Sequence, residues 1–304
     1  MKVIFMGSPD FAVPSLDIVH QHFELLAVVT APDKIGGRGH GLIETAVKKR
    51  GLELNIPVLQ PKNLKSEKFL SKLQKLDADI FVVVAFRMLP ISVWNLPKLG
   101  TINVHGSLLP SYRGAAPIQR AIMNGETNTG VTTFRLKEEI DTGDIILQSS
   151  LNLEENDTCG KVYNSLKEIG ANLLLDTLQQ IQNGTVKYLA QDFSNDYPHA
   201  AKIFHEDTEI HFDKTCVQVH NLIRGLSPYP GAFFNKSGMN YKILLAQKTD
   251  IEVGEKTSGE WDFSHAGKFL IACHDFFIEV LEIQQEGRRK LSAKDFINGI
   301  RNAK

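Results

Sequence analysis

The chain has no uninterrupted apolar run near the roughly 20 residues that a membrane-spanning helix needs. Its apolar start, MKVIFM, is followed by Pro9 and Asp10 before a signal-peptide core is complete. The charges are balanced, with 34 Lys and Arg against 35 Asp and Glu, so bulk charge offers no attraction for nucleic acid. We therefore expect a cytoplasmic protein without membrane contact, in which any contact with nucleic acid rests on local patches.

Cysteine is also scarce. The three cysteines, Cys159, Cys216 and Cys273, are isolated, with no CxxC pair and no histidine at ligand spacing. This pattern does not match a zinc site. We expect the three thiols to be reduced and structural, and the protein to hold no metal.

The first half of the chain, by contrast, has a strong alternating pattern, and the length of 304 residues favours two domains. Short, nearly continuous apolar runs rich in β-branched residues alternate with segments of helical period, which is typical of a parallel sheet covered by helices. The expected strands are 2–7, 25–30, 79–86 and 101–105, and the expected crossover helices are 10–22, 42–51 and 66–76.

The rest of the chain divides into a helical segment, a linker and a β-rich part. A helix at 115–124 and strands at 130–136 and 144–153 precede one long amphipathic helix at 157–183, with Gly184 at its C-terminal cap position. A polar, aperiodic stretch follows, and short strand-like runs after it predict a small β-barrel of the oligonucleotide-binding type. The predicted organisation is an α/β domain over 1–184, a linker over 185–204 and the barrel over 205–304.

Asn103 and His105 form the first candidate functional pair. Side chains alternate along a strand, so these two point the same way at the carboxyl end of a strand, where open α/β sheets bind ligands. An amide donor beside an imidazole can serve acyl transfer. On spacing alone, a structural histidine is an equally good interpretation.

Asp141 is a candidate third member of this set. It lies in the Gly-containing stretch EEIDTGDI, between two expected strands, from which it could reach the same sheet edge. A carboxylate beside a histidine orients the ring and stabilises its charged form. By itself the Asp-Thr-Gly-Asp stretch is explained better as a plain turn.

The stretch APDKIGGRGHG, residues 31–41, is a glycine-rich loop with Lys34 and Arg38. Its cations suit phosphate, but it has neither the dinucleotide-binding fingerprint nor the lysine and hydroxyl pattern of a P-loop. A nucleic-acid contact and a flexible solvated loop are about equally good interpretations of it.

The sequence resembles the family of formyltransferases that use 10-formyltetrahydrofolate. The resemblance rests on NVHGSLLPSYRGAAPIQ together with IDTGDI, and it runs from residue 3 to about 301 through MGSPDFAVPSL, APDKIGGRG, VVVAF, IRGLSPYPGAFF and IQQEGRRKLSAKDFINGIR. It implies a Rossmann-like formyltransferase domain, a linker and an OB-like β-barrel that helps to hold a transfer RNA. One departure is AFRMLP at 85–90, where many members have Ala-Tyr-Gly before an apolar-Leu-Pro turn.

The resemblance also implies site residues. It assigns catalysis to Asn103, His105 and Asp141, folate binding to the turn formed by Ser107, Leu108, Leu109 and Pro110, and contact with transfer RNA to Lys34 and Arg38.

The reaction that it implies is direct transfer of a formyl group from 10-formyltetrahydrofolate to the α-amino group of methionyl-initiator-tRNA, without metal or covalent intermediate. We expect a monomer. Three alternatives stay open: a formyltransferase for a nucleotide-linked sugar or glycinamide ribonucleotide, a folate hydrolase, and an RNA-binding module with an inactive first domain.

Overall fold

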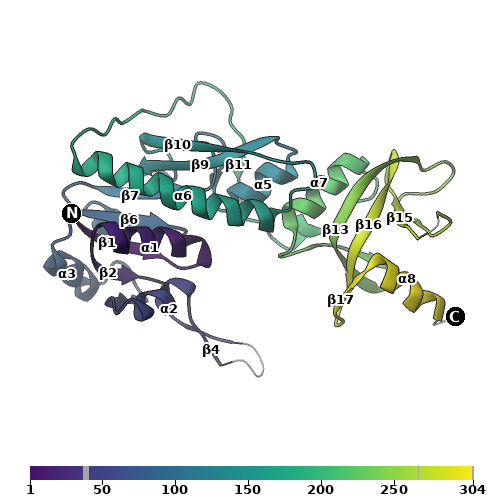
Figure 1. Cartoon of the computed structure of the whole chain (residues 1–304), viewed down its shortest axis with the longest axis horizontal. Coiled ribbons are helices and arrows are strands. Elements are labelled where there is room, and N and C mark those ends of the chain that lie inside the picture. The colour runs from purple at the N-terminus through teal and green to yellow at the C-terminus, as the bar shows by residue number, and fades with distance from the viewer. Residues whose placement is uncertain (37–40, 266, 303–304) are drawn as a thin grey trace. The chain divides into compact units, whose positions relative to one another are not determined.

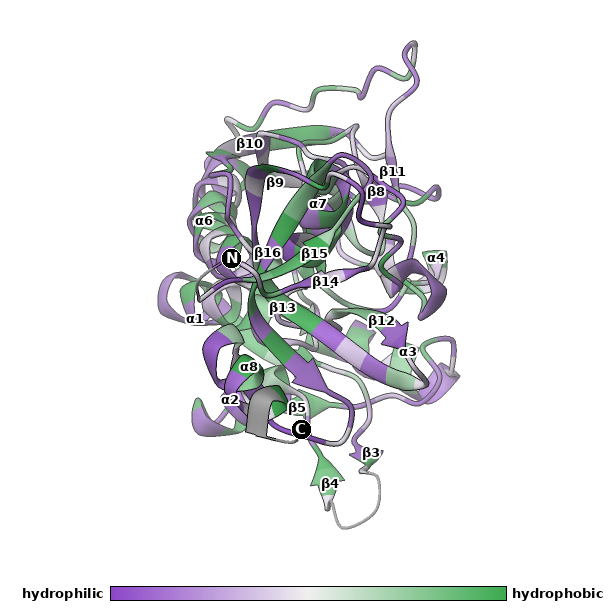
Figure 2. Cartoon of the chain, turned by 90° about the vertical axis from the view of Figure 1, so that its right-hand side faces the viewer, coloured by the Kyte–Doolittle hydropathy of each residue, from purple (hydrophilic) through white to green (hydrophobic). Residues whose placement is uncertain are grey.

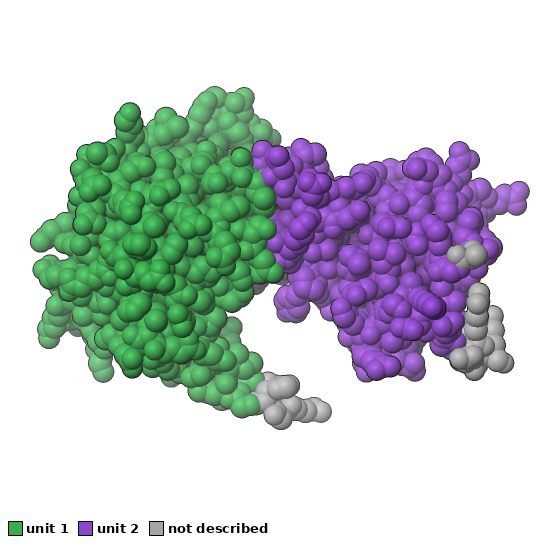
Figure 3. All heavy atoms as spheres, in the orientation of Figure 1, with its two compact units in different colours: residues 1–114, 130–151, 163–199 green, residues 115–129, 152–162, 200–304 purple. Residues whose placement is uncertain are grey.

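A computed structural model describes residues 1–36, 41–265 and 267–302. The chain forms two compact units, shown in green and purple in Figure 3. Unit 1 comprises residues 1–114, 130–151 and 163–199, and unit 2 comprises residues 115–129, 152–162 and 200–304. Each unit thus draws on several separate segments of the chain. The boundaries expected from the sequence, 1–184, 185–204 and 205–304, stay a prediction.

Unit 1 contains a seven-stranded sheet with the order β10-β9-β7-β6-β1-β2-β5 (Figure 1). The five strands from β7 to β5 are parallel, whereas β9 runs antiparallel to β7. The predicted parallel sheet is therefore correct for the five strands from β7 to β5, and β9 adds an antiparallel strand beside β7. The strands are β1 (Lys2–Gly7), β2 (Glu24–Val29), β5 (Val58–Leu59), β6 (Ile80–Val84), β7 (Thr101–His105), β9 (Asn128–Arg135) and β10 (Ile145–Asn152).

Helices cover this sheet because its central strands are apolar on both faces. Every residue of β6 is buried, which requires a helical layer on each side. The long helix α6 (Cys159–Gln182) matches the amphipathic segment expected from the sequence, and Gly184 has the positive φ of +68° that suits a helix cap. The other helices of this unit are α1 (Val13–His22), α2 (Ala46–Glu53), α3 (Glu67–Leu76) and α4 (Ile91–Trp94), with a 3₁₀ turn at Asp10–Ala12.

Close approach of α6 to the sheet depends on one glycine. A Cβ atom at Gly170 would lie 3.1 Å from a methyl group of Val104 on β7. Thr177 of α6 and Thr133 of β9 share a buried hydrogen bond of 2.7 Å. These contacts hold α6 against the two strands that carry or flank the candidate site.

Unit 2 is built on an antiparallel sheet with the order β12-β13-β16-β15-β14, to which β17 adds beside β16. Aromatic rings fill its core: Trp261 contacts Phe269 and Phe296 with ring centroids 5.1 and 5.9 Å apart. The strands curve into a half-barrel, which confirms the predicted β-rich second domain. They are β12 (Ala232–Lys236), β13 (Met239–Glu252), β14 (Trp261–Asp262), β15 (Phe269–Ala272), β16 (Phe276–Gln285) and β17 (Lys290–Ser292).

Three helices accompany this sheet, α5 (Pro117–Met123), α7 (Cys216–Leu226) and α8 (Ala293–Asn302). Helix α7 starts with a capping box formed by Thr215 and Gln218. Within the described residues, the segment 209–213 pairs only through an isolated bridge, from Glu209 to Phe233. Figure 2 shows β15 as continuously hydrophobic and β13 with mixed colours, in keeping with a fully buried and a half-buried strand.

The remaining short elements are β3 (Lys34–Ile35), β4 (Leu42–Ile43), β8 (Arg113–Gly114), β11 (His199–Ala200) and a 3₁₀ turn at Glu206–Thr208. All three cysteines are buried and free, and burial raises the pKa of the Cys159 thiol to about 12. Across residues 1–36, 41–265 and 267–302 no helix is both long and apolar enough to cross a membrane.

Candidate functional site

The carboxyl end of β7 carries the first two candidate residues. Because β7 is extended, Asn103 and His105 lie on the same side of the strand, as the sequence predicts. His105 is only 7% exposed, whereas Asn103 is half-buried. Within the described ranges the Asn103 amide makes no side-chain hydrogen bond, so its donors and acceptor are available to a ligand.

The two ring nitrogens of His105 have different surroundings. Nε2 lies 2.8 Å from the carbonyl oxygen of Tyr112. A carbonyl only accepts, so Nε2 carries a proton and donates it in this contact. The neutral ring then has its lone pair on Nδ1, which faces Asp141 Oδ2 at 3.8 Å. A proton taken up at Nδ1 therefore lies directly beside a carboxylate.

Asp141 lies in a turn whose conformation and contacts fix the position of its carboxylate. Its backbone has a positive φ of +55°, and its Oδ2 accepts a hydrogen bond of 2.9 Å from the amide of Gly114. A Cβ atom at Gly143 would lie 1.6 Å from the carbonyl oxygen of Arg135, so the chain can turn here only without a side chain. The loop thus places the carboxylate at the end of β7.

The turn that follows β7 is held from outside by two side chains. Thr132 donates to the carbonyl of Ser107 at 2.7 Å and accepts from the amide of Leu109 at 3.1 Å. Gln148 donates to the carbonyl of Leu109 and to Thr132 Oγ1, both at 2.9 Å. Sequence reasoning missed Thr132 and Gln148. Strand β9 reads NTGVTTFR and contains several polar residues, so nothing in its sequence distinguishes Thr132 from its neighbours.

The four residues of the predicted folate-binding turn are not equivalent. Ser107 is fully buried and donates to the carbonyl of Ser111 at 2.7 Å, and Leu109 is buried against Phe134. Leu108 and Pro110 are half-buried. A ligand in contact with this turn would therefore meet Leu108, Pro110 and backbone atoms, while Ser107 and Leu109 shape the turn from within.

In the stretch AFRMLP at 85–90, Arg87 makes specific contacts with another segment of the chain. Arg87 donates from Nη2 to the carbonyl of Pro61 at 2.8 Å and from Nη1 to that of Lys62 at 3.4 Å. Its guanidinium lies 5.3 Å from the ring centroid of Phe86, and burial lowers the pKa of the guanidinium below its ordinary value. Arg87 thereby ties the turn after β6 to the chain after β5.

The glycine-rich loop is described only in part. Lys34 is exposed on β3, which pairs with β4, and β4 is hydrophobic in Figure 2. Ile35 is 89% exposed and Leu42 is 62% exposed. Arg38 lies outside the described residues. Among the described residues, Lys34 makes no hydrogen bond or ion pair with Asn103, His105 or Asp141.

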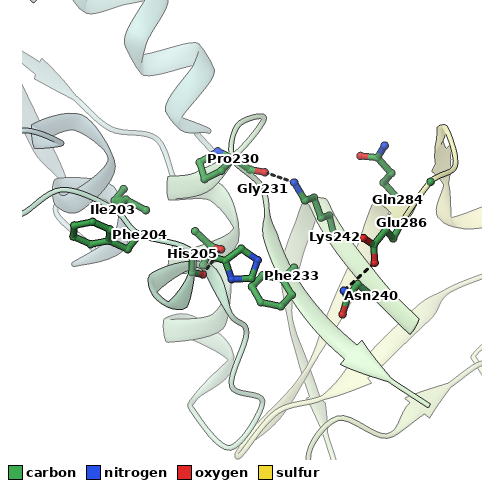
Figure 4. Close-up of a pocket in the computed structure, with 12 residues that line it drawn as sticks. Ile203, Phe204, His205, Pro230, Gly231, Phe233, Asn240, Lys242, Gln284 and Glu286 are labelled. Carbon is green, nitrogen blue, oxygen red and sulfur yellow. Dashed lines mark hydrogen bonds between the residues drawn. The ribbon is translucent and has the colours of Figure 1, made fainter. Parts of the chain in front are cut away.

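Unit 2 contains a pocket of about 550 Å³ that none of the predicted site residues lines. The rings of His205 and Phe233 lie against each other with centroids 4.5 Å apart, and Lys242 donates to the carbonyl of Pro230 at 2.7 Å (Figure 4). The pocket thus combines aromatic surface with polar groups that already have protein partners. In the described part of the chain, no three His, Cys, Asp or Glu side chains are grouped so that they could hold a metal ion.

Comparison with known families identifies the family of this chain. Residues 1–178 match the family model described as formyl transferase, and residues 202–301 match the one described as formyl transferase, C-terminal domain. This chain belongs to the formyl transferase family.

The relatives of this formyl transferase are similar over nearly their whole length. It is 42% identical to the methionyl-tRNA formyltransferase of Flavobacterium johnsoniae, with 99% of this chain and 96% of the relative covered. It is 41% identical to the methionyl-tRNA formyltransferase of Porphyromonas gingivalis, with 98% and 95% covered.

Two solved structures share the fold of this formyl transferase at low identity. An N-formyltransferase from Helicobacter canadensis, bound to folinic acid and dTDP-3-aminofucose, superposes with a TM-score of 0.66 at 23% identity, covering 92% of this chain and 98% of that one. HypX from Aquifex aeolicus, bound to tetrahydrofolic acid, gives 0.64 at 17% identity, covering 98% of this chain and 47% of that one. The predicted α/β formyltransferase fold with a β-rich C-terminal domain is thereby confirmed.

Proposed function

We propose that this formyl transferase moves the formyl group of 10-formyltetrahydrofolate to the α-amino group of methionine esterified to its initiator tRNA. The observation that carries the proposal is the set at the end of β7, where Asn103 and His105 share a face and Asp141 Oδ2 lies 3.8 Å from His105 Nδ1. The named relatives at about 40% identity support the choice of acceptor.

We assign His105 to accept the proton of the attacking amine. An amine attacks only through its free electron pair, so a base must keep it unprotonated or take its proton as the bond forms. In His105 this base is Nδ1, because Nε2 already donates to the carbonyl of Tyr112. Asp141 stabilises the imidazolium that results.

The amide of Asn103 supports the other half of the reaction. Negative charge grows on the formyl oxygen as the amine nitrogen bonds to the formyl carbon, and a placed donor stabilises this charge by about 3 kcal/mol. The bond between the formyl carbon and N10 then breaks, and N10 takes the proton. Formylmethionyl-tRNA and tetrahydrofolate are the products, so neither a metal nor a nucleophilic side chain enters the balance.

The folate and the tRNA require separate surfaces. We assign the folate to the turn of residues 107–110, with Leu108, Pro110 and the backbone in contact and Ser107 and Leu109 behind them. Lys34 and Arg38 suit the phosphates of the tRNA. We propose that the enzyme acts in the cytoplasm as a monomer.

The test compares several acceptors of the formyl group in the presence of the same donor, 10-formyltetrahydrofolate. The purified chain is incubated with 10-formyltetrahydrofolate and methionyl-initiator-tRNA, methionyl-elongator-tRNA, a nucleotide-linked amino sugar, or water alone. Rapid formation of formylmethionyl-initiator-tRNA is the expected result. Preference for the amino sugar, or release of formate without an acceptor, would instead identify a sugar formyltransferase or a folate hydrolase.

A further inference from the structure

We infer that Gln191 is a positioning residue for Asp141. Gln191 Nε2 donates to the backbone carbonyl of Asp141 at 2.9 Å and to that of Gly143 at 2.7 Å. One amide group thus bridges both sides of the turn that carries the carboxylate, although Gln191 lies 50 residues further along the chain. The inference rests on the proposed function, because it assigns Gln191 a part in that reaction.

The segment that carries Gln191 is fastened on both sides of it. Leu189 exchanges two backbone hydrogen bonds of 2.8 Å with Ile145 at the start of β10. On the other side, the guanidinium of Arg113 lies 4.6 Å from the ring centroid of Phe193. Figure 1 shows the chain after α6 running back along β10. Gln191 is therefore held in place by contacts that do not involve Asp141.

The Asp141 turn depends on such a support. Asp141 has a positive φ, which costs energy for any residue other than glycine. Such a conformation persists only where the surrounding structure holds it. Among the described residues, the carboxylate accepts a single hydrogen bond, from the amide of Gly114 to Oδ2. That same oxygen faces His105 Nδ1 at 3.8 Å, so a small shift of the turn changes the distance on which stabilisation of the imidazolium depends.

A purely structural role makes a different prediction from a positioning role. If Gln191 only stabilises the fold, its removal lowers the melting temperature and the amount of active protein, but not the rate per active molecule. If it acts through Asp141, its removal lowers the rate at saturating substrates, and the loss disappears once Asp141 can no longer supply a charge.

The experiment is a double-mutant cycle with Gln191→Leu and Asp141→Asn. Leucine has a similar size but cannot donate to the two carbonyls. The single-turnover rate is measured with the enzyme in excess over methionyl-initiator-tRNA and with 10-formyltetrahydrofolate saturating. Gln182→Leu is the matched control, because Gln182 is exposed at the end of α6.

A displacement of about 1 Å at a reacting group costs up to about a hundredfold in rate. We expect Gln191→Leu to lose about 10- to 100-fold in rate, with half-saturating substrate concentrations within about threefold of wild type and with no effect of Gln182→Leu. In the Asp141→Asn background the same change should cost less than about threefold.

Three results would overturn the inference. The first is a Gln191→Leu rate within threefold of wild type, and the second is a change in the half-saturating substrate concentrations without a change in rate. The third is a loss of rate from Gln191→Leu that is equally large in the wild-type and the Asp141→Asn backgrounds. If Gln191→Leu does not fold, Gln191→Asn replaces it under the same criteria, because its amide is one methylene too short for both carbonyls. If only the inference about Gln191 is wrong, the wild-type enzyme still formylates methionyl-initiator-tRNA. Absence of wild-type formylation would instead refute the proposed function, and the inference with it.

Discussion

Replacing Asp141 by asparagine tests the charge at the site while keeping its shape. Asparagine has almost the same size as aspartate, and its Oδ1 can still accept from the amide of Gly114, as Asp141 Oδ2 does at 2.9 Å. The substitution removes the negative charge that faces His105 Nδ1 at 3.8 Å. Any change in rate then reports the interaction between this charge and the protonated imidazole.

The size of the effect follows from the distance and the burial. The Asp141 and His105 side chains are 12% and 7% exposed. Two unit charges 3.8 Å apart attract each other by about 4 kcal/mol at an effective dielectric constant near 20. Each ~1.4 kcal/mol changes a rate tenfold, so Asp141→Asn should lower the rate by up to about a thousandfold.

The assay is single-turnover formylation of methionyl-initiator-tRNA, which keeps slow variants measurable. Asp144→Asn is the control, because it makes the same chemical change in the same loop, where Asp144 pairs with Lys137 at the surface at 2.7 Å. Such a surface pair contributes about 0–1 kcal/mol to stability, so this variant should keep the wild-type rate. A rate for Asp141→Asn within about threefold of wild type would refute the electrostatic role.

Three further predictions concern other parts of the chain. Asn103→Ala should lower the single-turnover rate about a hundredfold, since one donor to a developing oxyanion contributes about 3 kcal/mol; an unchanged rate would exclude Asn103 from the chemistry. Arg38→Ala should raise the half-saturating concentration of charged tRNA, less so at high salt, and an equal rise for the folate would contradict a phosphate contact. Burial, together with Arg224 and Lys248, lowers the pKa of His220 to about 4. The unfolded side chain titrates near 6.5, so between these values the unfolded state binds more protons and the fold loses stability as pH falls, by about 2 kcal/mol at pH 5. His220→Gln should remove that loss in urea unfolding at pH 7 and pH 5, and an equal loss in both proteins would contradict it.

Several features follow from the order of residues alone. The two-residue spacing of Asn103 and His105 places them on one face wherever the segment is extended, and β7 confirms this. The periodicity of 157–183 predicts α6 to within two residues at its start, and Gly184 has the predicted cap conformation. Such features are local, because a few neighbouring residues determine strand alternation and helix capping.

Other features depend on contacts between distant segments. The protonated nitrogen of His105 is determined by the carbonyl of Tyr112, and the shape of the turn after β7 by Thr132 and Gln148. The antiparallel direction of β9 was not predicted, because hydrophobic periodicity does not distinguish parallel from antiparallel neighbours.

The sequence by itself determined the two-domain plan, the order of the longer strands and helices of the first half, and the candidate set of Asn103, His105 and Asp141, but not the short elements β3, β4, β5 and α4. Only the tertiary structure decided that Asp141 lies 3.8 Å from Nδ1, and that Gln191 holds its turn from 50 residues away. The physical reason is the range of the interactions: periodicity and capping act within a few residues, whereas the geometry of a site depends on which distant carbonyls and side chains the folded chain brings together.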